Sequence, residues 1–225
     1  IDDPAVMAEH AKAHVQVGFN VIKTKVGVDF ASDLARVRAI REAVGDQVKI
    51  RLDANQGWKA KEAVELINRL NEYDIELVEQ PGPRFDFEGL KFVTAHSSVP
   101  IMADESCWDS KDALRLVSQR AVDLINIKLM KCGGLYEAKK ITAIAEAAGV
   151  EVMLGCMAEE SGIGVTAAAS LGAALKNITR ADLDATFSLK ELPYEGGFTV
   201  KDTRHLILSS DPGLGIKCLK KEMLA

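Results

Sequence analysis

The sequence predicts an α/β protein whose parallel strands form a barrel of the (β/α)8 type. Short β-branched runs alternate with amphipathic helical stretches, which is typical of parallel strands joined by crossover helices. Nearly all the predicted strands end in a charged side chain, and these ends recur about every 24 to 28 residues. Because catalytic groups of such barrels gather at the C-terminal ends of the strands, the repeat also indicates an enzyme.

An open, doubly wound sheet is the competing fold. It would place a glycine-rich phosphate loop after its first strand, and no Gly-x-Gly-x-x-Gly sequence stands there. A complete barrel has about 250 residues and begins with a strand, whereas this sequence has 225 residues and begins with a predicted helix. We therefore expect the first strand to be missing or shortened to Ile1, together with whatever preceded it.

Seven runs are predicted as strands because each is short, rich in β-branched or apolar residues and bounded by turn-forming or charged residues. In chain order they are Val21–Val26, Lys49–Ala54, Ile75–Gln80, Ile101–Glu105, Leu124–Leu129, Glu151–Cys156 and roughly Ala181–Phe187.

Helices are predicted between these strands from apolar residues spaced three and four apart. Two such stripes are Leu34, Val37, Ile40 and Val44 in one segment and Val64, Ile67 and Leu70 in the next. Asp29 or Ser32 can cap the first of these two helices. Further helices are expected near Pro4–Val17, Phe87–Ala95, Ser110–Ser118, Leu135–Ala148 and Ile163–Leu175.

The last part of the sequence is rich in turn-forming residues, among them Pro193, Gly196-Gly197 and Asp211-Pro212-Gly213. We expect a barrel domain over residues 1–187 and a loop-like segment over residues 188–225 that packs outside the barrel.

Composition excludes several classes of protein. The 28 Lys and Arg residues oppose 33 Asp and Glu residues, and the net charge of −5 argues against a nucleic-acid partner. No apolar run approaches the roughly 20 residues that a membrane span needs, and the N-terminus lacks the basic start of a signal peptide. The four cysteines form no Cys-x-x-Cys pair, which indicates a reduced, cytoplasmic protein.

Two lysines lie in the first predicted strand. Because strand side chains alternate, Lys23 and Lys25 point to the same face. If that face is the barrel interior, repulsion and desolvation would lower a lysine pKa and make the amine usable as a base. The alternative is an edge strand with a solvated lysine face.

Three carboxylates close three consecutive strands: Asp53, Glu79 and Asp104. They would repel one another at one barrel mouth, and a hard divalent cation such as Mg²⁺, or Mn²⁺ as a substitute, would resolve the repulsion. The alternative is that each acid pairs with a nearby cation, for example Lys25, Arg51 or Lys128.

Two further features lie at later strand ends. Lys128 ends the strand after the three acids, on the side of the mouth opposite Lys25, unless it is an ordinary surface lysine. Asp182 and Asp184 would share one face of the last strand, where they could bind a ligand's ammonium group; a helix cap or a solvated turn explains them equally well.

Together these residues resemble the enolase superfamily, in its muconate-lactonizing subgroup, and within it the dipeptide epimerases (L-Ala-D/L-Glu epimerase-like). The resemblance covers about residues 1–217. The motifs that carry it are Lys23-Thr24-Lys25, Asp53-Ala54-Asn55, Glu79-Gln80-Pro81, Ala103-Asp104-Glu105, Asn126-Ile127-Lys128 with Gly133-Gly134, and Asp182-Leu183-Asp184.

The resemblance implies a (β/α)7β barrel that here lacks its first strand, with the N-terminal α+β capping domain absent from this chain and residues 188–225 part of the capping region. It implies an Mg²⁺-dependent isomerase that epimerises a dipeptide by 1,1-proton transfer α to a carboxylate, through a metal-stabilised enediolate. The implied roles are metal ligands for Asp53, Glu79 and Asp104, acid/base catalysis for Lys25 and Lys128, an auxiliary cation for Lys23, and binding of the substrate ammonium for Asp182 and Asp184.

Other functions stay open. The same site suits a muconate cycloisomerase, an o-succinylbenzoate synthase or an N-acylamino acid racemase, because only Asp182 and Asp184 favour dipeptides. A catalytically silent barrel used for binding or assembly is the remaining alternative. A barrel lacking a strand exposes unpaired backbone, so we also expect low stability or association into a homo-oligomer.

Overall fold

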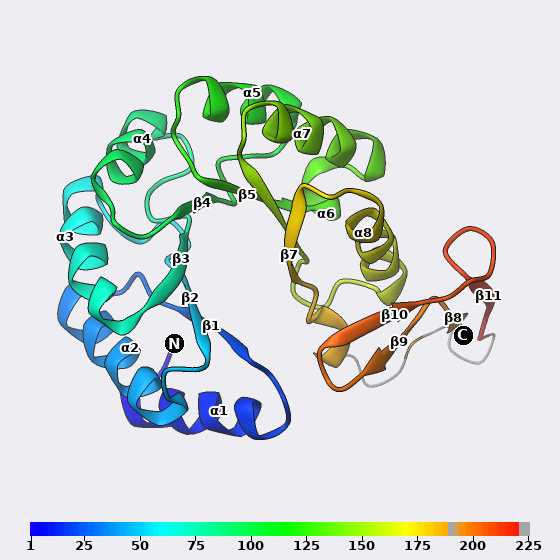
Figure 1. Ribbon diagram of the computed structural model, residues 1–225, viewed down its shortest axis with the longest axis horizontal. Coiled ribbons are helices and arrows are strands. Elements are labelled where there is room, and N and C mark those ends of the chain that lie inside the picture. The colour runs from blue at the N-terminus through cyan, green and yellow to red at the C-terminus, as the bar shows by residue number, and fades with distance from the viewer. Residues whose placement is uncertain (189–191, 193, 221–225) are drawn as a thin grey trace.

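The protein is described by a computed structural model that covers residues 1–188, 192 and 194–220. Seven parallel strands form one sheet in the order in which they occur in the chain. The sheet curls into an incomplete barrel, with the helices on its outer side (Figure 1). The strands are β1 (Val21–Lys25), β2 (Lys49–Asp53), β3 (Ile75–Glu79), β4 (Ile101–Ala103), β5 (Leu124–Lys128), β6 (Glu151–Gly155) and β7 (Ile178–Asp182). The predicted barrel architecture is confirmed, and residues 1–20 contain no strand.

The helices follow the predicted alternation with the strands. They are α1 (Pro4–Gln16), α2 (Phe30–Val44), α3 (Ala60–Leu70), α4 (Phe87–His96), α5 (Ser110–Ser118), α6 (Leu129–Cys132), α7 (Leu135–Ala147) and α8 (Gly162–Ala174). Asp29, and not Ser32, caps α2, because its side chain accepts a hydrogen bond from the Ser32 amide. The short α6 was not predicted, since four residues are too few to show an apolar period.

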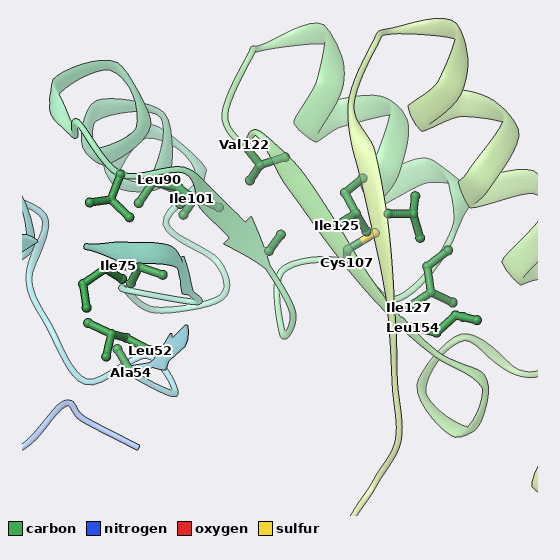
Figure 2. Close-up of a cluster of buried hydrophobic side chains, with 14 of the residues drawn as sticks. Leu52, Ala54, Ile75, Leu90, Ile101, Cys107, Val122, Ile125, Ile127 and Leu154 are labelled. Atoms are coloured by element: carbon green, nitrogen blue, oxygen red, sulfur yellow. The ribbon is translucent and has the colours of Figure 1, made fainter. Parts of the chain in front are cut away.

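The main hydrophobic core lies between the sheet and the helices. Leu52, Ile125 and Ile127 point outward from their strands and are almost fully buried against this layer (Figure 2). A small second cluster, formed by Leu77, Met102, Leu124 and Met153, lies apart from it. Because side chains alternate along a strand, the neighbours of the outward residues, such as Asp53 and Lys128, face the barrel interior.

The seventh strand was predicted too late in the sequence. It was expected over Ala181–Phe187 but spans Ile178–Asp182, where it pairs with β6 in the register Val152↔Ile178 to Gly155↔Asp182. The chain then turns into a 3₁₀ helix, η2 (Ala185–Ser188). The apolar residues Leu183 and Ala185 imitate a strand in the sequence, but they are buried beyond the end of the strand.

The C-terminal segment is more regular than the loop that was predicted. It contains β8 (Tyr194–Gly196), β9 (Phe198–Lys201), β10 (His205–Leu208) and β11 (Ile216–Leu219), which pair as two antiparallel ribbons, β9 with β10 and β8 with β11. Both ribbons lie outside the barrel, beside α8 (Figure 1). Part of the segment expected over residues 188–225, namely 189–191, 193 and 221–225, lies outside the described residues.

The two ends of the curled sheet are linked by side chains. Thr203 Oγ1 donates a hydrogen bond to the Val17 carbonyl at 2.7 Å, and the rings of Phe19 and Phe187 pack edge to face with centroids 6.1 Å apart. Across the described residues, none of the helices combines the length and apolar character that a membrane span requires.

Candidate active site

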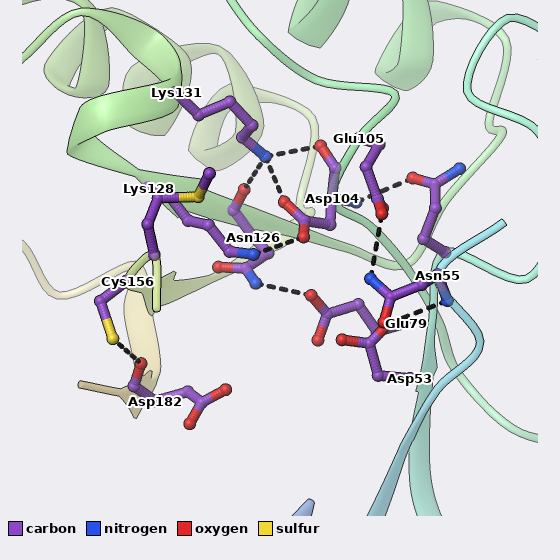
Figure 3. A network of polar contacts seen from close by, with 12 residues as sticks. Asp53, Asn55, Glu79, Asp104, Glu105, Asn126, Lys128, Lys131, Cys156 and Asp182 are labelled. Carbon is purple, nitrogen blue, oxygen red and sulfur yellow. Dashed lines mark hydrogen bonds and ion pairs between the residues drawn. The ribbon is translucent and has the colours of Figure 1, made fainter. Parts of the chain in front are cut away.

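Charged side chains from six of the strands meet at the C-terminal mouth of the barrel. Strand geometry explains the meeting, because residues paired in register on neighbouring parallel strands lie side by side: Lys25 pairs with Asp53, and Asp53 with Glu79. Asp104 directly follows β4, Lys128 is the last residue of β5, and Asp182 is the last of β7. Figure 3 shows how the acids and the later lysines converge.

Asp53 is fully buried and is neutralised from β1. Its Oδ2 atom lies 2.7 Å from Lys25 Nζ and 3.2 Å from Lys23 Nζ. Its Oδ1 atom accepts a hydrogen bond from the backbone N–H of Asn55. Both lysines therefore point into the barrel, as the alternation predicted. The alternative, an edge strand whose lysines both face solvent, is excluded. Half of the Lys25 side chain remains exposed (49%), which leaves its amine accessible from the mouth.

Glu79 is, like Asp53, a fully buried acid of the mouth. Its Oε1 accepts a hydrogen bond from Asn126 Nδ2 at 2.8 Å. Its Oε2 lies 2.8 Å from Lys23 Nζ and forms an ion pair with that ammonium. Burial raises the pKa of Glu79 to about 7 against the opposing effect of Lys23, and the negative charges of Asp53 and Asp104 add to the rise.

Lys23 is surrounded by acids. Besides Asp53 and Glu79, its Nζ lies 2.9 Å from Asp182 Oδ2. Burial alone would lower the pKa of Lys23, but the three carboxylates outweigh burial and raise that pKa above its ordinary value. The expectation of a lowered lysine pKa was thus wrong for Lys23, because the acids around it contribute more than its burial.

Asp104 is held between two lysines. Lys128 Nζ lies 2.6 Å from Oδ2, and Lys131 Nζ lies 2.6 Å from Oδ1 (Figure 3). Although burial opposes them, Lys131 and then Lys128 hold the pKa of Asp104 well below its usual range. Burial would lower the pKa of Lys128, but Asp104 raises it, so Lys128 is protonated at neutral pH.

Asp182 and Asp184 do not share a strand face, contrary to the prediction. β7 ends at Asp182, and Asp184 lies in the turn that leads into η2, with an exposed side chain. The two acids are still close to one another through Cys156, whose Sγ lies 3.3 Å from the Asp182 carbonyl oxygen and 3.5 Å from Asp184 Oδ1. Burial raises the pKa of the Cys156 thiol to about 12, so it acts as a neutral donor here.

Three supporting residues were missed by the sequence reasoning: Gln80, Asn126 and Lys131. Gln80 Oε1 accepts hydrogen bonds from the backbone amides of Asp104 and Ser106, and Gln80 thereby fixes the end of β4 beside the end of β3. Gln80 and Asn126 stand in recognised motifs but have no charge to draw attention, and Lys131 lies on the helix that was not predicted.

The acids form pairs with cations in the structure, which was the alternative considered for them. Lys25 and Lys128 are indeed partners of Asp53 and Asp104, whereas Arg51 pairs with Glu76 at 2.6 Å. Among the described residues, no three His, Cys, Asp or Glu side chains stand together as a ready-made metal site.

The donor chemistry nevertheless fits a hard divalent cation. Asp53, Glu79 and Asp104 are at most 2% exposed; the first two end β2 and β3, and Asp104 directly follows the neighbouring β4. Carboxylate oxygens are the ligands that Mg²⁺ prefers. Among the described residues, the buried Glu79 Oε2 is met by the Lys23 ammonium alone, in an ion pair, so it is an acceptor that can also take a metal cation.

Comparison with known proteins is consistent with this geometry. Residues 6–222 match the family model of the enolase C-terminal domain-like proteins. The chain is 58% identical over 216 residues to the hydrophobic dipeptide epimerase of Enterococcus faecalis, covering 96% of this chain and 61% of the relative. It is 48% identical to the L-Ala-D/L-Glu epimerase of Bacillus subtilis, covering 96% and 59%. The N-succinyl-L-Arg/Lys racemase of Bacillus cereus is 35% identical, with 96% and 58% covered.

Solved structures show the same similarity. The E. faecalis dipeptide epimerase complexed with Mg and the dipeptide L-Leu-L-Tyr superposes with a TM-score of 0.94, covering 97% of this chain and 62% of that one. A substrate-liganded complex of the B. subtilis epimerase, 47% identical, gives a TM-score of 0.93 and covers 96% and 60%. The chain thus spans about three fifths of the length of these relatives.

Proposed function

The chain belongs to the enolase C-terminal domain-like family, and from this premise we propose that it is the barrel of an Mg²⁺-dependent isomerase that epimerises dipeptides. The observation that carries the proposal is the arrangement of Lys25 on β1 and Lys128 on β5, with the buried acids of β2, β3 and β4 between their strands. Identities of 48% and 58% to dipeptide epimerases support the same substrate class.

We assign the metal to Asp53, Glu79 and Asp104, with Mn²⁺ as a substitute for Mg²⁺. When bound, the metal ion would supply positive charge beside a substrate carboxylate and stabilise the negative charge that develops there. The proton to be removed lies on the carbon next to that carboxylate and is only very weakly acidic, so a base alone would not suffice.

The two lysines transfer the proton on opposite faces of that carbon. One amine takes the proton and the other ammonium returns a proton to the opposite face, which inverts the centre. Lys128 is suited to the donor role because its raised pKa keeps it protonated at neutral pH. Lys23 is the auxiliary cation, since it lies within 3.2 Å of Asp53 and Glu79.

Asp182 and Asp184 are proposed to bind the N-terminal ammonium of the dipeptide. Their carboxylates lie at the mouth, near Lys23 and Cys156 respectively. A racemase of N-acylated amino acids is the second candidate, because the N-succinyl-L-Arg/Lys racemase is 35% identical over nearly the whole chain. An N-acylated substrate has no ammonium group, so the two aspartates separate these activities.

We also propose that residues 188–225 pack outside the barrel as part of the capping region of the complete enzyme, and that the protein is cytoplasmic. The first proposal is supported by the position of the ribbons outside the barrel wall. The second is supported by the four free cysteines, of which Cys107 and Cys132 are buried. Association into a homo-oligomer stays a prediction.

Deuterium uptake at the α-carbon tests the proposed function. The chain, and a chimera that adds the N-terminal remainder of the E. faecalis relative, are incubated with L-Ala-L-Glu and L-Leu-L-Tyr in D₂O with Mg²⁺. Uptake is expected from a dipeptide. Formation of the deuterated opposite epimer, which needs both lysines, should fall by about 10² or more in Lys25→Ala and in Lys128→Ala but not in Lys12→Ala, an exposed lysine of α1. Absence of uptake from both proteins, or uptake that survives a chelator, would contradict the proposal.

A further inference from the structure

A buried lysine outside the acid/base pair fixes one oxygen of Asp104. The Lys131 side chain is only 4% exposed. Its Nζ donates to Asp104 Oδ1 at 2.6 Å, to the Asp104 carbonyl at 2.5 Å and to the Asn126 carbonyl at 2.9 Å. An ammonium group has three N–H donors, and all three are used here, so this contact is a fixed part of the barrel.

The other oxygen of Asp104 is held much less firmly. Lys128 Nζ lies 2.6 Å from Oδ2, its side chain is 14% exposed, and among the described residues it makes this one hydrogen bond. To free Oδ2, one partly exposed side chain must turn away. To free Oδ1, a buried ammonium that two backbone carbonyls hold in place must lose its carboxylate partner, and leaving a buried charge unpaired is strongly unfavourable.

We propose that Lys131 is a positioning residue that leaves Asp104 a single oxygen, Oδ2, for a divalent cation, and that it thereby favours Mg²⁺ over Ca²⁺. Small cations such as Mg²⁺ require six ligands in near-ideal octahedral geometry, to which a carboxylate contributes one oxygen. Ca²⁺ takes six to eight oxygens and readily uses both oxygens of a carboxylate. The inference rests on the proposed function, because it concerns the same metal site.

Selectivity, and not affinity, is the informative quantity. The positive charge of Lys131 repels every divalent cation at Asp104 to a similar extent, since Mg²⁺ and Ca²⁺ carry the same charge. A variant without this charge can therefore bind both cations more tightly. Only the ratio of the two dissociation constants reports how many oxygens Asp104 offers.

The test is calorimetric titration of the 225-residue chain with MgCl₂ and with CaCl₂, in the wild type, Lys131→Met and Lys131→Gln. The wild type is expected to prefer Mg²⁺. Each variant should shift the ratio of dissociation constants toward Ca²⁺ by about tenfold, the size typical of losing a partner of a metal ligand. Lys131→Gln keeps N–H donors for the carbonyl acceptors and serves if Lys131→Met does not fold.

Arg41→Met is the matched control. Counted over the whole residue, Arg41 is 8% exposed and Lys131 9%, and Arg41 donates to the carbonyls of Gly45 and Val48, away from the barrel mouth. This variant should melt at a lower temperature and keep the wild-type ratio, which shows that lost stability does not change selectivity.

The outcomes are distinct. A folded Lys131 variant with the wild-type ratio would overturn the role of Lys131 and leave the proposed function standing. A wild-type chain that binds Ca²⁺ as tightly as Mg²⁺ would overturn it without any variant. A wild-type chain that binds neither cation would remove the metal site itself, and the proposed function with it.

Discussion

Lys23 and Asp182 lie on the two edge strands of the sheet, 159 residues apart in the sequence, and their side chains meet at 2.9 Å. The strands β1 and β7 form no backbone hydrogen bonds with one another, but the Lys23–Asp182 ion pair joins them at the mouth. The same ammonium also contacts the buried Asp53 and Glu79. A single side chain thus connects the edges of the barrel and neutralises part of its interior.

Lys23→Met is expected to cost more stability than Asp182→Asn. Removing the lysine leaves the buried carboxylates without their shared cation, which costs about 3 kcal/mol or more. Removing Asp182 leaves Lys23 with two acidic partners. Because Asp182 is also partly exposed, a loss of about 1 kcal/mol in the free energy of unfolding is expected. Urea unfolding at pH 8, above the Glu79 pKa of about 7, measures both; equal losses would show that Lys23 is not the common partner.

Replacing both Asp182 and Asp184 by Asn should abolish dipeptide turnover. An N-succinyl amino acid has no ammonium for them to bind, so its turnover should change little if the site accepts it. Values of kcat/KM for the dipeptide and for the N-succinyl amino acid, compared between the wild type and the double variant, measure the two effects. Cys156→Ala is the companion variant, because it removes the thiol that contacts the Asp182 backbone carbonyl and the Asp184 carboxylate, and it should raise KM for dipeptides without abolishing turnover. Equal loss for both substrates in the double variant would exclude the assigned role.

Mg²⁺ should raise the melting temperature of the wild-type chain. A ligand that binds only the folded state at about 100 times its Kd stabilises that state by about 2.7 kcal/mol. Asp104→Asn should remove most of this shift, because a neutral amide is a poorer ligand for a hard cation. Asp211→Asn, at an exposed acid of the C-terminal segment, should retain the shift in full. A wild-type melting temperature that does not respond to Mg²⁺ favours the silent barrel.

Glu76 provides a prediction remote from the chemistry. It pairs with Arg51 at 2.6 Å and with Arg180 at 3.2 Å. Burial opposes ionisation, but Arg51 outweighs it and lowers the pKa of Glu76. A lowered carboxyl pKa gives stability that is present above the ordinary carboxyl range and is lost as the pH falls through the lowered pKa.

Glu76→Gln should therefore destabilise the protein by about 1.5–3 kcal/mol at pH 7, and the difference from the wild type should narrow as the solution is acidified. Urea unfolding at several pH values measures the difference. Glu9→Gln, at an exposed acid 3.9 Å from Lys12, should have almost no effect at any pH. A Glu76→Gln difference that is constant down to strongly acidic solution would contradict the electrostatic explanation.

Much of the site could be predicted from the sequence because strand ends are periodic. Lys25, Asp53, Glu79 and Lys128 each close a strand, and parallel strands bring their ends together, so spacing alone groups these residues. The sign of the lysine pKa shifts could not be predicted in this way. It depends on how many acids surround Lys23, and two of those acids come from strands β3 and β7, remote from β1 in the sequence.

The failures of prediction have local causes. The seventh strand was placed late because Leu183 and Ala185 continue an apolar alternation past the last residue that pairs with β6. The C-terminal ribbons were missed because they are short and depend on glycines. Gly196 and Gly197 both have positive φ, and a Cβ atom at Gly196 would lie 2.0 Å from the Gly215 carbonyl oxygen. Such close approaches are properties of the folded backbone and leave no periodic signal.

The short segment from Lys128 to Lys131 has a practical consequence for protein engineering. The strand end carries the proposed proton donor, and one helical turn later the same segment carries the lysine that fixes Asp104. Grafting a foreign loop after β5, or inserting a residue there, would therefore change reaction chemistry and ion preference in one step. New activities that must keep the magnesium site are better sought in the loops after β6 and β7, which can be exchanged without disturbing that linkage.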